Sequence, residues 1–135
     1  MGKFIIASGP VIVEDGKVLL NKHGDPPLLW KFCGGRVETL DADLRENAQR
    51  EAREEIGVEL EFADEPPYLM YTSKPAPDGG MIDILLVHWL TTRVGEITLG
   101  SDIVEAKWLD LATIADQTDL SPNILPALRH FGFIK

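Results

Sequence analysis

The chain has a single cysteine, Cys33, among its 135 residues. A disulfide framework and a cysteine zinc site both need more than one cysteine, so the sequence excludes them. A lone thiol fits a reducing compartment. No apolar run approaches the roughly 20 residues of a membrane-spanning helix, and the N-terminal residues lack the pattern of a signal peptide. We therefore expect a cytoplasmic protein that does not act at a membrane.

Positive charge is also scarce. Thirteen Lys and Arg residues face 22 Asp and Glu residues, and the net charge is −9. This balance argues against a nucleic acid as a partner, because its phosphate backbone would be repelled. A phosphorylated substrate would need metal ions or a local basic patch. The length and the 44% apolar content are typical of one globular domain, which we expect over residues 1–135.

Short apolar segments alternate with turn residues and predict a mixed sheet with helices packed on its faces. Asp15-Gly16, between two apolar runs, predicts a hairpin turn. A helix is predicted over Leu44–Ile56, and a final helix with Ser121 as its N-cap and Pro122 as its first residue. The predicted strands are Phe4–Val13, interrupted at Ser8-Gly9-Pro10, then Val18–Asn21, Val37-Glu38, Val58–Phe62, Tyr68–Ser73, Met81–Thr92 and Glu105–Leu109, with a loop at Lys74–Gly80.

The first predicted helix carries an unusual cluster of acidic residues. Asp43 or Asp41 is the predicted N-cap, and Gly57 is the predicted C-cap glycine. Glu51, Glu54 and Glu55 share a helix face and repel one another. A divalent cation would balance them, and Mg²⁺ prefers carboxylate oxygens. A solvated acidic face is the common alternative for a Glu-rich helix.

The segment Gly34–Val58 resembles the signature of the Nudix hydrolase family. Its second half, Arg50-Glu51-Ala52-Arg53-Glu54-Glu55-Ile56-Gly57-Val58, matches the family pattern Arg-Glu-apolar-x-Glu-Glu-x-Gly-apolar at every specified position. A glycine pair, Gly34-Gly35, precedes it, as in the family. The resemblance implies a Nudix-like α/β/α sandwich, with a mixed β-sheet and helices on both faces.

The first half of the signature departs from the family pattern. Asp41 stands where the family has Glu, and Gln49 then falls where Arg belongs. One inserted residue in the loop Thr39–Ala42 explains both differences. Asp41 would replace the family's Glu, or Asp43 would cap the helix in its place. Because that Glu position is mainly structural, the resemblance implies that activity survives.

The family hydrolyses nucleoside diphosphates linked to another group, with Mg²⁺ or Mn²⁺ activating the attacking water. By position, the resemblance implies Glu54 and Glu55 as metal ligands and Glu51 as a ligand or the base. The carbonyl oxygen of Gly34 would also bind the metal, and Arg50 would orient a carboxylate. Gly35 and Arg36 are the candidates for binding substrate.

Other polar residues give weaker signals. The family often takes a further acid from the loop before its penultimate strand, where Asp102 and Glu105 are candidate ligands or solvated acids. His88 is expected to be packed or hydrogen-bonded, and His23 and His130 have no spacing that indicates a site. We expect Trp30, Phe32 and Trp89 in the core and Cys33 as a small buried residue.

The substrate stays open at this level. Pro75 lies 17 residues after Val58, which is close to the proline of ADP-ribose hydrolases, but a proline in a loop needs no substrate to explain it. A nucleotide sugar such as ADP-ribose and a (deoxy)nucleoside triphosphate both fit, and a homodimer is compatible. The alternatives to an enzyme are a catalytically silent Nudix domain that binds nucleotide or protein, and an acidic cation-buffering domain. The second lacks an EF-hand loop.

Overall fold

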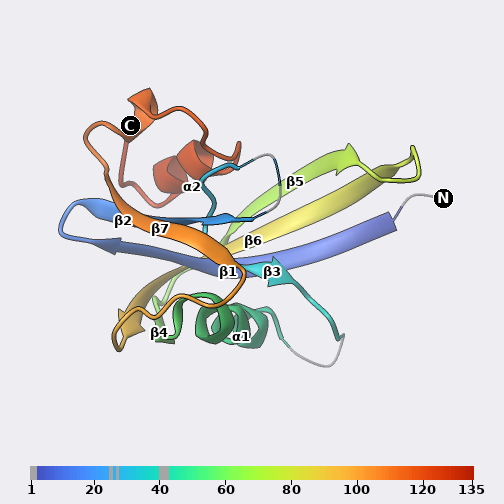
Figure 1. The fold of residues 1–135 in the computed structure, drawn as a ribbon. Helices are drawn as coiled ribbons and strands as arrows, with labels where there is room; N and C mark the ends of the chain where they lie inside the picture. Colours follow the sequence, from blue (N-terminus) through green and yellow to red (C-terminus); the bar gives the residue numbers. More distant parts are fainter. Residues whose placement is uncertain (1–2, 25, 27, 40–42) are drawn as a thin grey trace.

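The computed structural model describes residues 3–24, 26, 28–39 and 43–135. In this part of the chain a seven-stranded mixed sheet follows the order β4-β6-β1-β2-β7, with β3 paired to β1 and β5 paired to β6 (Figure 1). The strands are β1 (Lys3–Glu14), β2 (Lys17–His23), β3 (Gly35–Arg36), β4 (Glu59–Phe62), β5 (Tyr68–Pro75), β6 (Met81–Val94) and β7 (Ile103–Asp110). The helices are α1 (Leu44–Ile56), the short 3₁₀ helix η1 (Ile114–Asp116) and α2 (Ile124–His130).

The sheet is organised around β1. This strand is parallel to β6 along one side and antiparallel to β2 and β3 along the other. The predicted interruption at Ser8-Gly9-Pro10 was wrong, because β1 runs through these residues without a break. Gly9 has a different role: a β-carbon on it would collide with the carbonyl oxygen of Cys33. Its missing side chain lets the segment before Gly34 lie directly against the central strand.

The β1–β2 hairpin turns as predicted. Val13 pairs with Val18 and Glu14 with Lys17. Both turn residues have positive φ, 51° at Asp15 and 76° at Gly16, as a two-residue type I′ turn requires. The tight turn sets the register of β2, and the register decides which β2 side chains face α1.

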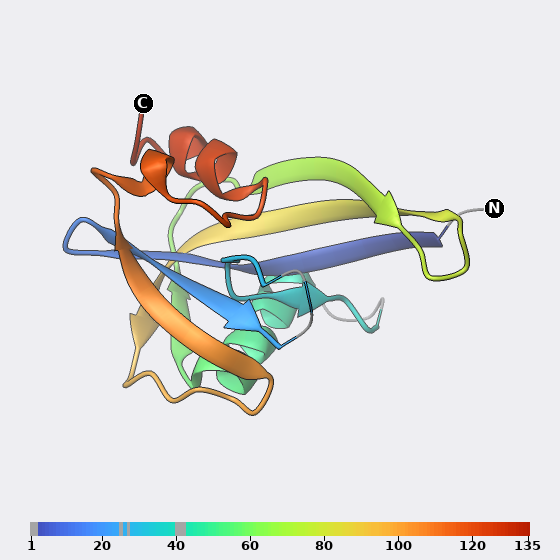
Figure 2. The same cartoon turned by 45° about the horizontal axis from the view of Figure 1, so that its top comes forward.

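The two α-helices cover opposite faces of the sheet, which confirms the predicted layer arrangement (Figures 1 and 2). Each face has its own apolar cluster. The cluster under α2 contains the predicted core residues Trp30 and Phe32, each 5% exposed. The cluster under α1 includes Ile12, Leu19, Cys33, Ala52 and Ile56.

Several predicted boundaries were wrong by two residues or more, among them the following three. Asn123, not Ser121, precedes α2, and its side chain bonds to His88 at 2.7 Å instead of capping the helix. The short third strand is Gly35–Arg36, two residues earlier than the predicted Val37-Glu38. β5 extends to Pro75, so the predicted loop Lys74–Gly80 was placed two residues too early at its start. In each case pairing with a neighbouring element, which local sequence does not reveal, set the limit.

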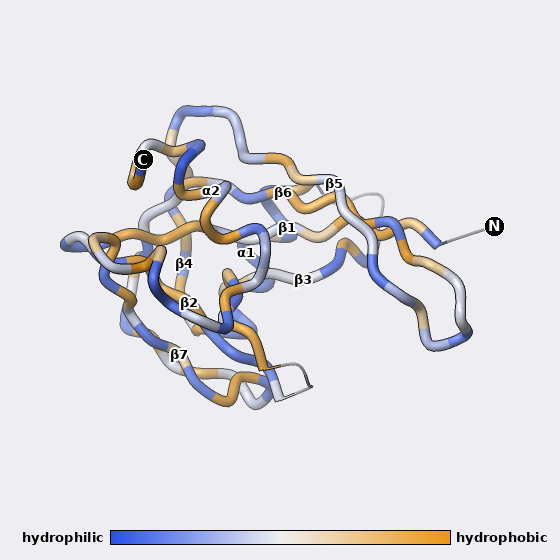
Figure 3. Tube along the Cα trace, turned by 90° about the horizontal axis from the view of Figure 1, so that it is seen from above, coloured by the Kyte–Doolittle hydropathy of each residue, from blue (hydrophilic) through white to orange (hydrophobic). Residues whose placement is uncertain are grey.

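Hydrophobic and hydrophilic segments alternate along the chain, as the tube in Figure 3 shows. No helix in the described ranges combines the length and the apolar character that crossing a membrane demands.

Candidate active site

Helix α1 begins and ends where the sequence predicted. The Asp43 carboxylate accepts a hydrogen bond from the Glu46 backbone N–H at 2.8 Å, as an N-cap does. Gly57 closes the helix at φ 71° and donates its N–H to the Ala52 carbonyl. Asp41, the alternative cap, and the rest of the inserted loop at 40–42 lie outside the described residues. The start of the helix is therefore fixed by Asp43.

Two rows of side chains at i, i+4 spacing run along the buried side of α1. Ala48, Ala52 and Ile56 form an apolar row, each 0% exposed. Beside it runs a polar row of Asn47, Glu51 and Glu55, which are 3%, 8% and 6% exposed. The apolar row packs against the sheet. Because the polar row lies beside it on the same helix, its side chains are buried as well.

The three glutamates are not equivalent, although the sequence placed them on one face. Glu51 and Glu55 are buried, whereas the Glu54 side chain is 57% exposed and lies 3.3 Å from Arg50 Nη1. The acidic cluster is thus a buried pair with a third carboxylate at its solvent edge. A wholly solvated acidic face, the common alternative, does not describe this helix.

Glu55 is held from the sheet and from the glycine pair. Its Oε1 accepts from Asn21 Nδ2 and from the Gly34 backbone N–H, both at 3.3 Å, and lies 3.6 Å from His23 Nε2. Burial and the neighbouring Glu51 carboxyl raise the pKa of Glu55 to about 8, although the Gly34 N–H and the Asn21 amide oppose the shift. Two carboxylates in this place therefore lack a cationic partner strong enough to keep both ionised.

Glu51 lies against the glycine pair. A β-carbon on Gly35 would come within 2.5 Å of the Glu51 carboxyl carbon, so a side chain there would force the carboxyl group to move. Arg50 Nη2 lies 3.0 Å from Glu51 Oε1. The pairing of Arg50 with a helix carboxylate, which the sequence predicted, is therefore present.

The loop that carries the glycine pair is tied to α1 by polar side chains. Asn47 Nδ2 donates to the Gly35 carbonyl at 2.9 Å and to Ser8 Oγ at 3.2 Å. Ser8 Oγ donates in turn to the Leu44 carbonyl at 2.7 Å. This network joins β1, the loop and the first turn of α1, so the Gly35 backbone has one position relative to Glu51.

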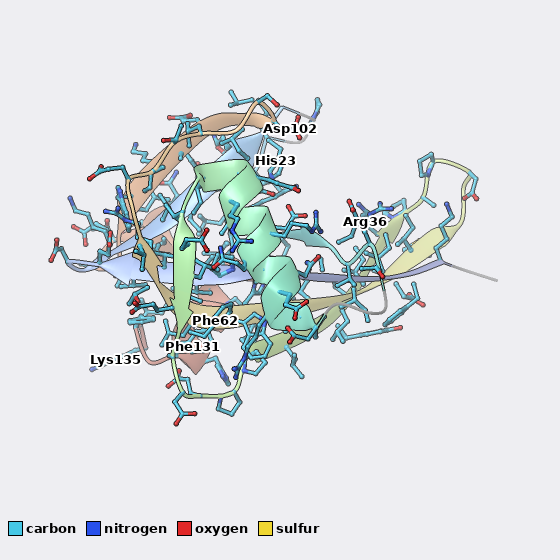
Figure 4. All side chains as sticks on the ribbon, turned by 90° about the horizontal axis from the view of Figure 1, so that it is seen from below. His23, Arg36, Phe62, Asp102, Phe131 and Lys135 are labelled. Carbon is cyan, nitrogen blue, oxygen red and sulfur yellow. The ribbon has the colours of Figure 1, made fainter. Side chains whose placement is uncertain are left out.

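Arg50 extends the same network toward the surface. Its Nη2 donates to Asn47 Oδ1 at 2.7 Å and to the Arg36 carbonyl at 3.2 Å. Arg36 itself is exposed, beside α1 (Figure 4). Its side chain is therefore open to solvent, and its role in binding substrate stays a prediction.

The two candidate acids outside α1 are placed differently. Asp102 is exposed at the end of a loop whose Gly100 N–H donates to the Glu55 carbonyl at 2.9 Å. Figure 4 shows Asp102 near His23 at one end of α1. Glu105 pairs across the ladder with Lys22, next to Ala106, which packs in the core under α1. Since neighbouring strand residues point to opposite faces, Glu105 faces away from α1. The geometry favours Asp102.

The remaining predictions concern residues outside the cluster. His88 is buried and bonded to Asn123, which agrees with a packed histidine. Trp89 was expected in the core, but it is only half-buried, with the Arg45 guanidinium 4.9 Å from its ring centroid. Cys33 is 5% exposed, and burial together with the nearby Glu55 carboxylate raises the pKa of its thiol. Its thiol therefore stays protonated and unreactive.

The donor chemistry fits a hard divalent cation. The described residues contain no group of three or more His, Cys, Asp or Glu side chains arranged to hold a metal ion. Mg²⁺ does not require such a cage, because it keeps several waters and uses one or two carboxylates plus substrate phosphate oxygens. The buried pair of Glu51 and Glu55, beside backbone without side chains at Gly34-Gly35, supplies that kind of partial ligand set.

Sequence reasoning missed three residues that build the site. Asn47 and Asn21 each bind a member of the acidic cluster or its loop, and Gly9 makes room for Cys33. A signal for Asn47 was its place four residues before Glu51 on the same helix row. The signal for Asn21 was a polar residue at the end of the apolar run Val18–Leu20. The sequence offered no signal for Gly9, because its neighbour Cys33 is distant along the chain.

Comparisons with known proteins agree with this geometry. A family model described as the NUDIX domain matches residues 4–131. No curated protein matches the sequence. The fold is similar to the solution structure of the E. coli ORF135 protein, with 26% identity over 96% of this chain and 89% of that one, at a TM-score of 0.72.

Two further solved structures share the fold. A MutT NUDIX hydrolase from Burkholderia pseudomallei has 23% identity over 94% of this chain and 97% of that one, at a TM-score of 0.74. A C. elegans Ap4A hydrolase binary complex has 21% identity over 94% of both chains, at a TM-score of 0.71. At these identities the likeness concerns the fold.

Proposed function

The chain belongs to the Nudix hydrolase family, and from that premise we propose that this pyrophosphohydrolase uses Mg²⁺ to cleave a nucleoside diphosphate linked to another group. Nudix hydrolases generally use divalent metals. The observation that carries the proposal is the buried pair of Glu51 and Glu55 facing the Gly34-Gly35 backbone. Buried like charges are costly, and a divalent cation offsets that cost.

Glu51, Glu55 and the Gly34 carbonyl would hold the cation, with Glu54 at the solvent edge and Asp102 from the β7 loop completing the set. Bound there, Mg²⁺ would neutralise charge on the pyrophosphate and acidify a bound water, and Mn²⁺ could take its place. Asp102 is preferred to Glu105 because Glu105 faces the other side of the sheet.

The other residues bind and orient. Arg50 forms an ion pair with the Glu51 carboxylate and donates a hydrogen bond to the Arg36 carbonyl. A guanidinium presents several donors in a fixed plane, so Arg36 suits a phosphate group at the exposed rim. Gly35 would take part through its backbone, which carries no side chain of its own. Glu51 is either a ligand or the base that takes a proton from water.

The substrate class is proposed as a nucleotide sugar such as ADP-ribose or a (deoxy)nucleoside triphosphate. The C. elegans neighbour is named for Ap4A hydrolysis, so a dinucleoside polyphosphate belongs in the same test. Because the chain has a net charge of −9, it would bind any of these anions through the cation and the exposed Arg36 side chain.

The test measures phosphate products from a panel of these nucleotides with Mg²⁺ and with chelator. Wild type is compared with Glu51→Gln and Glu55→Gln, and Glu46→Gln serves as the matched control because Glu46 is exposed on the same helix. We expect turnover of at least one substrate that requires metal, falls by two or more orders of magnitude in the site variants and survives in the control. No turnover on any substrate, or turnover that both site substitutions leave intact, would refute the proposal.

We also propose that residues 1–135 form one domain that works in the cytoplasm. The buried, protonated thiol of Cys33 needs no oxidising compartment. A homodimer is the assembly to test, by size-exclusion chromatography with light scattering. A mass of one chain at micromolar concentration would exclude it.

A further inference from the structure

Asn21 has a buried side-chain amide that makes no hydrogen bond to the backbone of its own strand. It is 1% exposed in β2. Its backbone N–H and carbonyl both bond to Lys31 at 2.8 Å, so the main chain is satisfied without help from the side chain. An apolar residue would fit this position in a strand at least as well, since its neighbours Leu19 and Leu20 are apolar and buried.

The side chain of Asn21 is only half satisfied. Its Oδ1 is buried and has no hydrogen-bond partner in the described part of the chain. A buried acceptor without a partner lowers stability, because it has given up its bond to water. The other end of the amide, Nδ2, donates to Glu55 Oε1 at 3.3 Å. Any gain that offsets the unpaired oxygen must therefore come through Glu55.

Three nitrogen atoms converge on one oxygen of Glu55, whose carboxyl group also bonds to the Glu51 carboxyl and the Cys33 thiol. Asn21 Nδ2 and the Gly34 N–H reach the same oxygen, Oε1, and His23 Nε2 is nearest to that oxygen as well. Asn21 and His23 alternate along β2 and so face the same side, toward α1. A carboxylate gripped through one oxygen keeps a fixed rotamer and presents the second oxygen in one direction.

We propose that Asn21 is a positioning residue for cation binding: it holds Oε1 of Glu55 so that the second oxygen is presented to the divalent cation. This inference rests on the proposed function, because it assumes that Glu55 is a metal ligand. The unpaired Oδ1 of Asn21 then lowers the stability of the fold, and the position of Glu55 is what that loss secures. Groups that orient a ligand in this way commonly change metal affinity by 10- to 100-fold when removed.

The main variant is Asn21→Leu, which has the same number of side-chain heavy atoms and no amide, and the smaller Asn21→Val is the second. Thr91→Val is the matched control: Thr91 is 3% exposed and donates its hydroxyl to the Val11 carbonyl at 3.3 Å, so it too is a buried polar group in the sheet. Mn²⁺ binding to the substrate-free proteins is measured by electron paramagnetic resonance of the free ion. The Tm of each protein is measured with chelator.

A positioning role and a purely structural role give different results. We expect Asn21→Leu to weaken Mn²⁺ binding by 10- to 100-fold, while its Tm in chelator stays equal to wild type or rises. Excess Mn²⁺ should restore most of its turnover. Thr91→Val should leave Mn²⁺ affinity unchanged. Unchanged Mn²⁺ affinity in both Asn21 variants, or loss of the folded state in both, would overturn the proposal.

The route through Glu55 is tested by a double-mutant cycle. In a Glu55→Gln background, Asn21→Leu should change Mn²⁺ affinity by less than 2-fold, because the carboxylate it positions is already gone. An equal 10- to 100-fold loss in both backgrounds would show that Asn21 acts elsewhere and would overturn the proposal. The proposed function fails separately, if wild type neither binds Mn²⁺ nor hydrolyses any nucleotide of the panel.

Discussion

The α-carbon of Gly35 lies directly against the carboxyl group of Glu51, so closely that a β-carbon on Gly35 would come within 2.5 Å of the carboxyl carbon. The two residues come from different elements, β3 and α1. Asn47, one turn before Glu51 on α1, keeps them together. Its side-chain amide donates a hydrogen bond of 2.9 Å to the Gly35 carbonyl. The distance between loop and helix is therefore set by the absence of a side chain.

Gly35→Ala should disable the site without unfolding the protein. The new methyl group would displace either the Glu51 carboxyl or the loop backbone, and a shift of about 1 Å in a catalytic group can cost 100-fold in rate. We expect kcat/KM to fall at least 10-fold with a native circular-dichroism spectrum. Gly80→Ala is the control, because it lies in the exposed β5–β6 turn near only the Asp78 side chain. Equal activity in both variants would contradict the assigned close contact.

Arg50→Lys should lower activity although it keeps the charge. The guanidinium of Arg50 contacts Glu51, Asn47 and the Arg36 carbonyl from one end group, and an ammonium cannot reproduce that planar set. We expect a 10- to 100-fold loss, mainly in kcat. Arg53→Lys is matched in helix and charge, but its exposed partner is Glu59, and steady-state kinetics should barely change. A larger loss in Arg53→Lys than in Arg50→Lys would reverse this assignment.

Divalent cations should stabilise the protein through the buried pair. A ligand that binds only the folded state at 100 times its dissociation constant adds about 2.7 kcal/mol, which should raise the Tm by several degrees in thermal denaturation with Mg²⁺ or Mn²⁺. Glu55→Gln should abolish the rise, and without metal it should not lower the Tm, because a pKa of about 8 already leaves the Glu55 carboxyl group largely protonated near neutral pH. Glu46→Gln should keep the rise. A metal-dependent shift that survives in Glu55→Gln would place the cation elsewhere.

Acid should destabilise the fold through His88. Burial lowers the pKa of His88 from 6.5 to about 4, and the Gly9 backbone offsets only part of the shift. Above pH 6.5 the residue is neutral in both folded and unfolded chains and has no effect. As the pH falls from 6.5 to 4 the unfolded chain gains the proton first, so stability drops, by about 3 kcal/mol over the window.

Urea unfolding at pH 7.5 and pH 5.0 measures this dependence. His88→Gln should reduce the difference between the two pH values, because the amide does not titrate in this range. His130→Gln is the control, since His130 is exposed on α2. If His88→Gln shows the same pH dependence as wild type, His88 does not cause it.

The N-cap of α1 should contribute measurably to stability. Asp43→Ala removes the acceptor for the Glu46 N–H, and loss of such a cap costs about 1 kcal/mol. Asp43→Ser keeps an acceptor and should recover most of the loss in urea unfolding. If Asp43→Ala is neutral, another acceptor must cap the helix, with Asp41 as the first candidate to mutate.

Local sequence predicted the elements that local interactions determine. The limits of α1 were correct because Asp43 and Gly57 are recognisable caps, and the β1–β2 turn was correct because Asp-Gly favours positive φ. The start of α2 was wrong because Asn123 bonds to His88 on β6 instead of capping its helix. Ser8-Gly9-Pro10 looked like a break because the partners that make it a strand lie far along the chain.

The sequence by itself determined the family, the fold class and the identity of the acidic cluster, because the signature at Arg50–Val58 is a contiguous helix with fixed spacing. Only the tertiary structure decided how the cluster divides. Glu51 and Glu55 are buried and Glu54 is exposed because the apolar row from Ala48 to Ile56 orients the helix against the sheet. The structure also brought Asn21 to Glu55 and turned Glu105 away from α1, because strand register sets which side chains face α1.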